Sequence, residues 1–175
     1  MRSKTACFTG HRIIPKQDRE CIKKRLNKAV IELLDEGVVN FVSGFALGFD
    51  LMAAEEVLRL KESYPQARLI AALPCTDQNC RWAEEDRLLY QRLLDRADEV
   101  VYVSKRPYFN ECMKIRNKYL VEVSRVCVAY FCEERPRSGT GQTVRLAKKD
   151  SCKVVNLASG EVYEADIDYR GIPFC

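Results

Sequence analysis

Short apolar runs alternate with amphipathic, helix-like runs along most of this chain of 175 residues. The short runs are apolar on both faces, which is typical of strands buried inside a parallel sheet. Strands that alternate with helices indicate such a sheet with helices covering both of its sides. The sequence therefore predicts an α/β fold, namely a single-domain Rossmann-like three-layer arrangement with a mostly parallel sheet of about six strands.

The expected elements follow from the spacing of apolar residues. Strands are expected at residues 5–9, 38–43, 68–73, 99–104, 126–131 and 153–157, and helices at residues 18–37, 48–60, 82–96, 113–124 and 142–149. Gly37 follows the first helix as a stop signal. We expect one domain over residues 1–175, with its core between residues 5 and 157 and a short tail at 159–175.

Composition narrows the class of protein. With 47% hydrophobic and 31% charged residues the chain is typical of a globular protein, and no apolar run is long enough to span a membrane. The formal net charge of +4 is lower than expected for a dedicated nucleic-acid binder. The N-terminus does not resemble a signal peptide, so we expect a cytoplasmic protein without a membrane partner. A homo-oligomer stays open.

Cysteine and histidine usage argues against a metal centre. The nine cysteines include no Cys-x-x-Cys pair, and His11 is the only histidine. Reduced cysteines of a cytosolic α/β protein act mostly as small hydrophobic residues. We therefore expect no metal site and no required cofactor.

Three loops that leave the carboxyl ends of expected strands carry glycine. In such folds ligands bind beyond these strand ends, and N–H groups at a helix N-terminus favour an anion. The loops therefore predict a phosphate-bearing ligand, most simply a nucleotide. The residues expected to contact it are Gly10, His11, Arg12, Ser43, Gly44, Gly48, Asp50, Arg116, Gly139, Thr140, Gly141 and Thr143.

Each of these signals has a purely structural alternative. The loop from Gly44 to Asp50 lacks the Rossmann glycine spacing and the Walker lysine, and would also suit a tight strand-to-helix turn with a capping carboxylate. His11 could donate to a ligand or cap its own loop. Arg116 could clamp a phosphate or lie on a solvated helix face. Trp82 is expected in the core rather than as a stacking surface.

The combination of motifs resembles the YpsA-like proteins of the SLOG superfamily, which also contains DprA and the lonely-guy phosphoribohydrolases. The residues that carry the resemblance, between about Thr5 and Leu157, are Gly10-His11-Arg12, Ser43-Gly44 through Asp50 with Ala53-Ala54-Glu55, Trp82, Lys105-Arg106-Pro107-Tyr108, Arg116-Asn117 and Gly139-Thr140-Gly141-x-Thr143. The resemblance implies a Rossmann-like fold and a nucleotide-derived ligand. It implies no activity, because none is established for YpsA-like proteins.

One departure from the lonely-guy pattern bears on catalysis. Those enzymes carry Pro-Gly-Gly-x-Gly-Thr-x-x-Glu, and aligning its glycines with Gly139 and Gly141 places Arg145 at the glutamate. Arg116 matches their upstream arginine. The carboxylate that would stabilise an oxocarbenium-like centre is thus missing from its place. Catalytic residues stay unknown, with Arg116, Asp50 and Glu55 as candidates.

These patterns favour a protein that binds a nucleotide or an ADP-ribose-like ligand as a sensor or regulatory module, without catalysis. The first alternative is an N-glycosidic hydrolase related to the lonely-guy enzymes. A DprA-like single-strand binder is a weaker alternative, prompted by Lys148 and Lys149 beside Arg145. Such a binder needs aromatic residues along a charged groove, whereas most aromatic residues here fall inside expected strands. Nucleic acid is therefore not the expected partner.

Overall fold

The computed structural model describes residues 2–132, 134, 137–159 and 162–163. Within these residues seven strands form one sheet with the order β4-β3-β2-β1-β5-β6-β7. Each pair of neighbouring strands from β4 to β6 in this order is parallel. The strands are β1 (Thr5–Gly10), β2 (Asn40–Ser43), β3 (Arg68–Leu73), β4 (Glu99–Tyr102), β5 (Val126–Tyr130), β6 (Lys153–Asn156) and β7 (Val162–Tyr163). The predicted α/β, mostly parallel sheet is confirmed.

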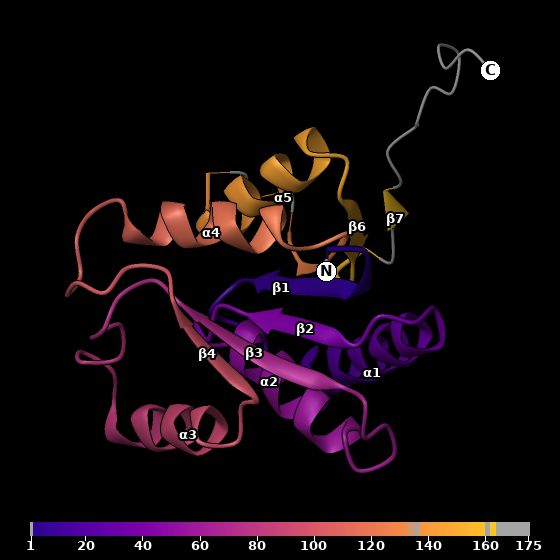
Figure 1. The fold of residues 1–175 in the computed structure, drawn as a ribbon, viewed down its shortest axis with the longest axis horizontal. Helices are drawn as coiled ribbons and strands as arrows, with labels where there is room; N and C mark the ends of the chain where they lie inside the picture. Colours follow the sequence, from indigo (N-terminus) through magenta and orange to yellow (C-terminus); the bar gives the residue numbers. More distant parts are fainter. Residues whose placement is uncertain (1, 133, 135–136, 160–161, 164–175) are drawn as a thin grey trace.

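Helices cover both faces of the sheet (Figure 1). On one side lie α1 (Arg19–Asp35), α2 (Phe49–Leu60) and α3 (Glu84–Leu94), and on the other α4 (Cys112–Glu122) and α5 (Gly139–Lys149). A short 3₁₀ turn, η1 (Arg2–Lys4), precedes β1. The result is the three-layer arrangement that the alternating pattern predicts.

Side-chain alternation along the strands divides the core between the two faces. Phe8 packs with the helices α1 to α3, whereas its neighbour Cys7 packs with α4 and α5. The same division holds along β5, where Val128 faces the first cluster and Cys127 the second. Both clusters are built from buried apolar side chains, which explains why these strands are mostly apolar on both faces, with the buried Thr5 and Thr9 of β1 as exceptions.

Strand order reverses at β1, and this reversal positions the site. From β1 the chain proceeds outward through β2, β3 and β4, and then returns to place β5 on the other side of β1. The carboxyl ends of β1 and β5 therefore lie side by side, with Gly10 in register with Tyr130. Loops diverge in opposite directions from such a point, leaving a crevice between them.

Several element bounds differ from the sequence-based expectation. The helix after β5 begins at Gly139 rather than at residue 142, because Ser138 caps it by accepting a hydrogen bond from the Gly141 N–H at 3.0 Å. Trp82 precedes α3 in a turn instead of opening the helix. The antiparallel strand β7 was not expected, and the rest of the tail, residues 164–175, lies outside the described residues.

No helix in the described ranges combines the length and the apolar character that crossing a membrane requires.

Candidate functional site

A cavity of about 390 Å³ opens where the strand order reverses. We call it the rim cavity. It is lined by the end of β1 and the following loop, the N-terminal parts of α2 and α5, and one face of α4. The lining residues are Thr9, Gly10, His11, Arg12, Ala46, Asp50, Met113, Arg116, Asn117, Ser138, Gly139 and Thr140. The three glycine loops that the sequence singles out thus meet in one place.

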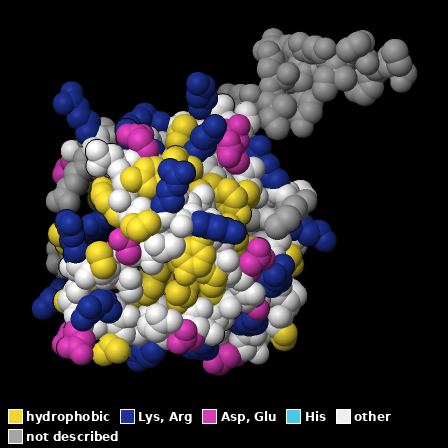
Figure 2. Space-filling view, turned by 60° about the vertical axis from the view of Figure 1, so that its left-hand side comes forward, with side chains coloured by type: hydrophobic (Ala, Val, Ile, Leu, Met, Phe, Trp, Pro, Cys, Tyr) yellow, Lys and Arg dark blue, Asp and Glu magenta, His cyan; other side chains and the backbone are white. Residues whose placement is uncertain are grey.

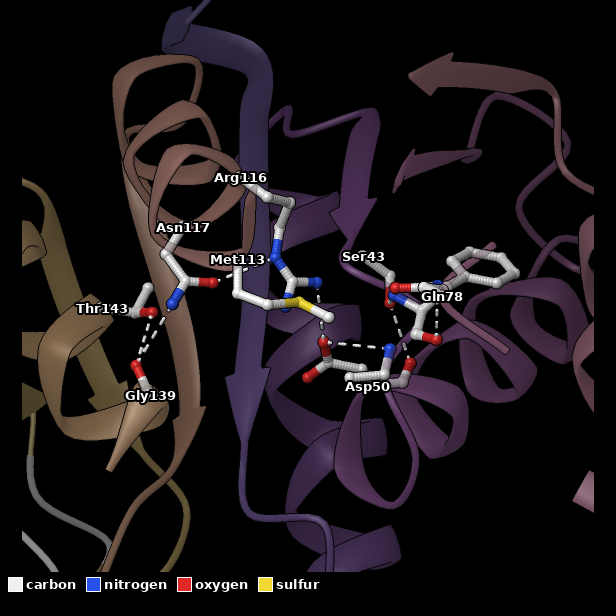
Figure 3. Close-up of polar contacts among 10 residues, drawn as sticks. Ser43, Asp50, Gln78, Met113, Arg116, Asn117, Gly139 and Thr143 are labelled. Carbon is white, nitrogen blue, oxygen red and sulfur yellow. Dashed lines mark hydrogen bonds and ion pairs between the residues drawn. The ribbon is translucent and has the colours of Figure 1, made fainter. Parts of the chain in front are cut away.

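A buried ion pair forms the floor of the rim cavity. Arg116 of α4 and Asp50 of α2 are 6% and 4% exposed, and the Arg116 Nη1 atom lies 3.7 Å from an Asp50 carboxylate oxygen. Figure 3 shows Arg116 between Asn117 on one side and Asp50 on the other. Two elements from opposite faces of the sheet therefore contribute one charge each to the same point.

The guanidinium of Arg116 has more donors than acceptors around it. Its Nε–H donates to the Asn117 side-chain oxygen at 3.0 Å, and Nη2 contacts the Met113 sulfur at 3.9 Å. Sulfur is a weak acceptor. In the described part of the chain Nη1 is buried and has no hydrogen-bond partner, because 3.7 Å to Asp50 is longer than a hydrogen bond. Burial lowers the pKa of Arg116.

Asp50 is held by the loop that precedes its helix. The Ala46 N–H donates to an Asp50 carboxylate oxygen at 3.4 Å, and the Ser43 hydroxyl donates to the Asp50 carbonyl at 2.9 Å. Burial nevertheless raises the pKa of Asp50 to about 6, against the lowering effect of Arg116 and of nearby backbone N–H groups. The carboxyl therefore changes its charge near neutral pH.

The raised pKa makes a stability prediction for Asp50→Asn. The folded-state pKa of about 6 lies above the ordinary value of 3.8. The stabilisation from Asp50 is therefore fully present below pH 3.8 and is lost as the pH rises through 6. A shift of this size corresponds to about 3 kcal/mol. Urea denaturation should show the stability of the wild-type protein falling relative to Asp50→Asn by about this amount between about pH 4 and pH 7.

The exposed carboxylate Glu122 at the end of α4 offers the matched control, because Glu122→Gln should show no comparable change across that range. A free-energy difference between wild type and Asp50→Asn that is flat with pH would contradict the assignment.

Gly44 gives the guanidinium its room. A Cβ atom at Gly44 would overlap Arg116 Nη1 and would lie 2.9 Å from an Asp50 carboxylate oxygen. Glycine at position 44 therefore lets the Arg116 side chain approach the backbone closely, and its own backbone conformation is not unusual. Gly48 differs, since its φ is +83° and a Cβ there would overlap the backbone carbonyl of Arg12. This second glycine is the positive-φ turn that the sequence allowed.

The N-terminus of α5 faces the same cavity. The N–H groups of Gly139 and Thr140 belong to the first turn of the helix, where no intrahelical acceptor is available. Asn117 donates from its amide to the Gly139 carbonyl at 3.4 Å, and Thr143 donates to the same carbonyl at 3.1 Å. These contacts tie α4 to α5 and fix the helix end beside Arg116 (Figure 3).

His11 joins the ends of β1 and β5. Its Nε2 atom accepts a hydrogen bond from the Cys132 N–H at 3.0 Å, and its backbone N–H donates to the Tyr130 carbonyl at 3.2 Å. The ring is 8% exposed and lines the rim cavity. An accepting Nε2 places the proton of a neutral imidazole on Nδ1. This contact corresponds to the loop-capping alternative for His11.

The sequence-predicted residues divide into two groups. On the cavity wall lie Gly10, His11, Arg12, Asp50, Arg116, Gly139 and Thr140. Behind the wall lie Ser43, Gly44, Gly48, Gly141 and Thr143, which support the loops. Glu55 lines different cavities, because it stands five residues after Asp50 and thus about 140° around α2.

The site also contains lining residues that the prediction did not include. Met113 lies three residues before Arg116 on the same face of α4, a spacing that could have indicated it. Ser138 directly before a glycine-rich helix start is a recognisable N-cap signal. Among the described residues no group of three or more His, Cys, Asp or Glu side chains could hold a metal ion.

Comparison with known proteins agrees with this architecture. A model described as the YspA SLOG family matches residues 13–159. A UPF0398 protein of Halalkalibacterium halodurans is 35% identical over 73% of this chain and 68% of its own length. A UPF0398 protein of Bacillus cereus is 34% identical over 68% of this chain and 65% of its own. The chain thus spans about two thirds of these relatives.

Two solved structures share the fold. The DNA processing protein A of Helicobacter pylori, described with a unique single-stranded DNA binding mode, gives a TM-score of 0.60 at 20% identity and covers 87% of this chain and 64% of its own. DprA of Streptococcus pneumoniae gives a TM-score of 0.60 at 19% identity, and the match covers 86% of this chain and 48% of the DprA chain. At such identities the likeness concerns the fold alone.

Proposed function

We propose that this chain, which belongs to the YspA SLOG family, binds a nucleotide or an ADP-ribose-like ligand in the rim cavity and acts as a sensor or regulatory protein. The anionic part of the ligand lies against Arg116 and the N-terminus of α5. The sugar lies near Asp50, whose carboxylate accepts hydrogen bonds from hydroxyl groups.

The observation that carries the proposal is the buried guanidinium of Arg116 on the wall of the rim cavity, which has more donors than acceptors around it. A buried donor without an acceptor is costly, because it has lost its water without gaining a partner. Phosphate is tetrahedral and supplies several acceptor oxygens, two of which match the planar fork of donors on a guanidinium. The two N–H groups at the start of α5 add donors and a favourable helix dipole on the same anion. Donors from two elements thus converge on one point.

A thermal-shift screen tests the proposal. NAD, ADP-ribose, cyclic nucleotides and the four nucleoside 5′-monophosphates should be compared with adenosine, which carries the base and sugar without phosphate. A ligand at one hundred times its dissociation constant should stabilise the fold by about 2.7 kcal/mol. Adenosine at the same concentration should stabilise far less. A flat response to every phosphate-bearing compound from a folded protein would contradict the proposal.

Asp50 supports a second candidate, N-glycosidic hydrolysis. It is the carboxylate on the rim cavity beside Arg116, and it could replace the glutamate of the lonely-guy motif by stabilising positive charge on the sugar. Asp50 does not stand at the motif position of that glutamate, which Arg145 occupies, so we expect binding without appreciable release of free base. Chromatography of the four monophosphates after incubation decides between the candidates. Base release that disappears in Asp50→Asn but persists in Glu55→Gln would establish hydrolysis.

A further inference from the structure

A second cavity, of about 430 Å³, adjoins the rim cavity and shares Arg12 and Met113 with it. We call it the side cavity. We propose that the side cavity binds the nucleobase, the planar aromatic part, of the ligand whose anionic part lies in the rim cavity. This inference rests on the proposed function and deepens it. The residues of the side cavity that the argument uses are Leu47, Asp77, Gln78, Trp82 and Tyr108.

The walls of the side cavity suit a flat ring. Trp82, Leu47 and Met113 are partly exposed apolar side chains, and the Tyr108 ring is 57% exposed. Every nucleobase has a π face that stacks on aromatic side chains. The face that carries the loops leading into α3 and α4 has hydrophobic side chains gathered at its centre, with Lys and Arg side chains and also Asp and Glu side chains around them (Figure 2). The apolar centre suits the aromatic part of a ligand, and Arg12 and Arg81 in the lining of the side cavity suit an anionic part beside it.

Trp82 is held in place before any ligand arrives. Its ring packs edge-on against Tyr90 with the centroids 5.4 Å apart, and Tyr90 packs in the same way against the core residue Phe45 at 5.9 Å. The Gln78 amide donates to the Phe45 carbonyl at 3.1 Å. A surface that is ordered in advance loses little conformational freedom when a ligand binds.

The two loops around the side cavity are tied to each other. The Tyr108 N–H donates to an Asp77 carboxylate oxygen at 2.6 Å, and the Thr76 N–H donates to the Arg106 carbonyl at 3.1 Å. The side cavity therefore exists as a built space between the segments after β3 and β4. Among its polar residues, which also include Arg12 and Arg81, Asp77 and Gln78 are the candidates for hydrogen bonds to the edge of a base.

The single tryptophan of the chain provides a direct readout. Binding of the four nucleoside 5′-monophosphates and ADP-ribose should be compared with binding of ribose 5-phosphate, which lacks a base. We expect at least one nucleotide to bind at least tenfold more tightly than ribose 5-phosphate and to quench Trp82 fluorescence, excited at the long-wavelength edge of tryptophan absorption where the bases absorb only weakly. Ribose 5-phosphate should bind without quenching.

Two exposed tyrosines make a matched pair of variants. Tyr108→Ala removes a ring from the side cavity, whereas Tyr102→Ala removes a comparably exposed ring from β4 that lines neither cavity. Tyr108→Ala should remove most of the tenfold preference for the nucleotide and leave the affinity for ribose 5-phosphate unchanged. Tyr102→Ala should change neither. Both rings are at the surface, so the fold should tolerate either change.

The outcomes separate this inference from the proposed function. If nucleotides bind no more tightly than ribose 5-phosphate, or if Tyr108→Ala weakens both equally, the base does not lie in the side cavity although the anion site stands. If neither ribose 5-phosphate nor any nucleotide binds, the proposed function fails and this inference fails with it.

Discussion

Arg116→Met is expected to lower the affinity for ribose 5-phosphate and for nucleotides by at least a hundredfold, measured by isothermal titration calorimetry. Truncating one partner of a buried, hydrogen-bonded charge pair commonly costs about 2–5 kcal/mol of binding energy. Here the lost group also supplies the Nη1 donor that has no hydrogen-bond partner in the described structure. Methionine keeps much of the side-chain volume, so the cavity should not collapse.

The variant also leaves Asp50 without its cation, which raises the carboxyl pKa further and destabilises the fold. The double variant Asp50→Asn, Arg116→Met removes both charges and should recover stability without recovering binding. Arg87→Met is the matched control, because Arg87 is an exposed arginine of α3 that lines neither cavity. Unchanged affinity in Arg116→Met would remove this arginine from the binding site.

Gly48→Ala is expected to destabilise the fold by about 2–5 kcal/mol, the sum of positive-φ strain and overpacking. Gly48 has a φ of +83°, and a Cβ atom there would overlap the backbone carbonyl of Arg12. The Arg12 backbone cannot relieve this overlap by a change of rotamer, as a side chain could. The neighbouring hydrogen bond from the Phe49 N–H to the His11 carbonyl, at 3.3 Å, would have to shift.

Gly37 is a close control for this glycine. Its φ is also +83°, but a Cβ atom at Gly37 would meet nothing within 4 Å. Gly37→Ala should therefore cost only the strain of the left-handed conformation, about 1–2 kcal/mol. Urea denaturation of the two variants isolates the contribution of the clash. Equal destabilisation by both variants would mean that the backbone of Gly48 and Arg12 moves apart at no cost in stability.

The fold could be predicted because its two periodicities are strong and mutually consistent. Buried runs such as β1 and β5 carry apolar residues on both faces, and α1 repeats apolar residues at helical spacing. The strand β7 could not be predicted from such a pattern, because two residues are too few to show alternation. The start of α5 was misplaced because glycines disfavour helix interiors, whereas the Ser138 cap places them in the first turn.

The location of the site could be predicted from the sequence, but the residues that line the cavity could not all be predicted. The convergence of the glycine loops follows from parallel strands ending at one edge of the sheet. Which residues reach the cavity depends on helix rotation and on packing between elements distant in sequence. Thr143, an expected ligand contact, donates to the Gly139 carbonyl behind the cavity wall, and Gly44 makes room for Arg116. Trp82 contacts the core through Tyr90 and still lines the side cavity.

The position of bound ribose 5-phosphate tests the central claim most directly. In a crystal structure of the complex, we expect the phosphate within hydrogen-bond distance of the Arg116 guanidinium and of the Gly139 and Thr140 N–H groups, and the sugar hydroxyls beside Asp50. Ribose 5-phosphate carries no base, so its position does not depend on the side cavity. A phosphate bound elsewhere on the protein, with the rim cavity empty at a concentration that saturates binding in solution, would contradict the account.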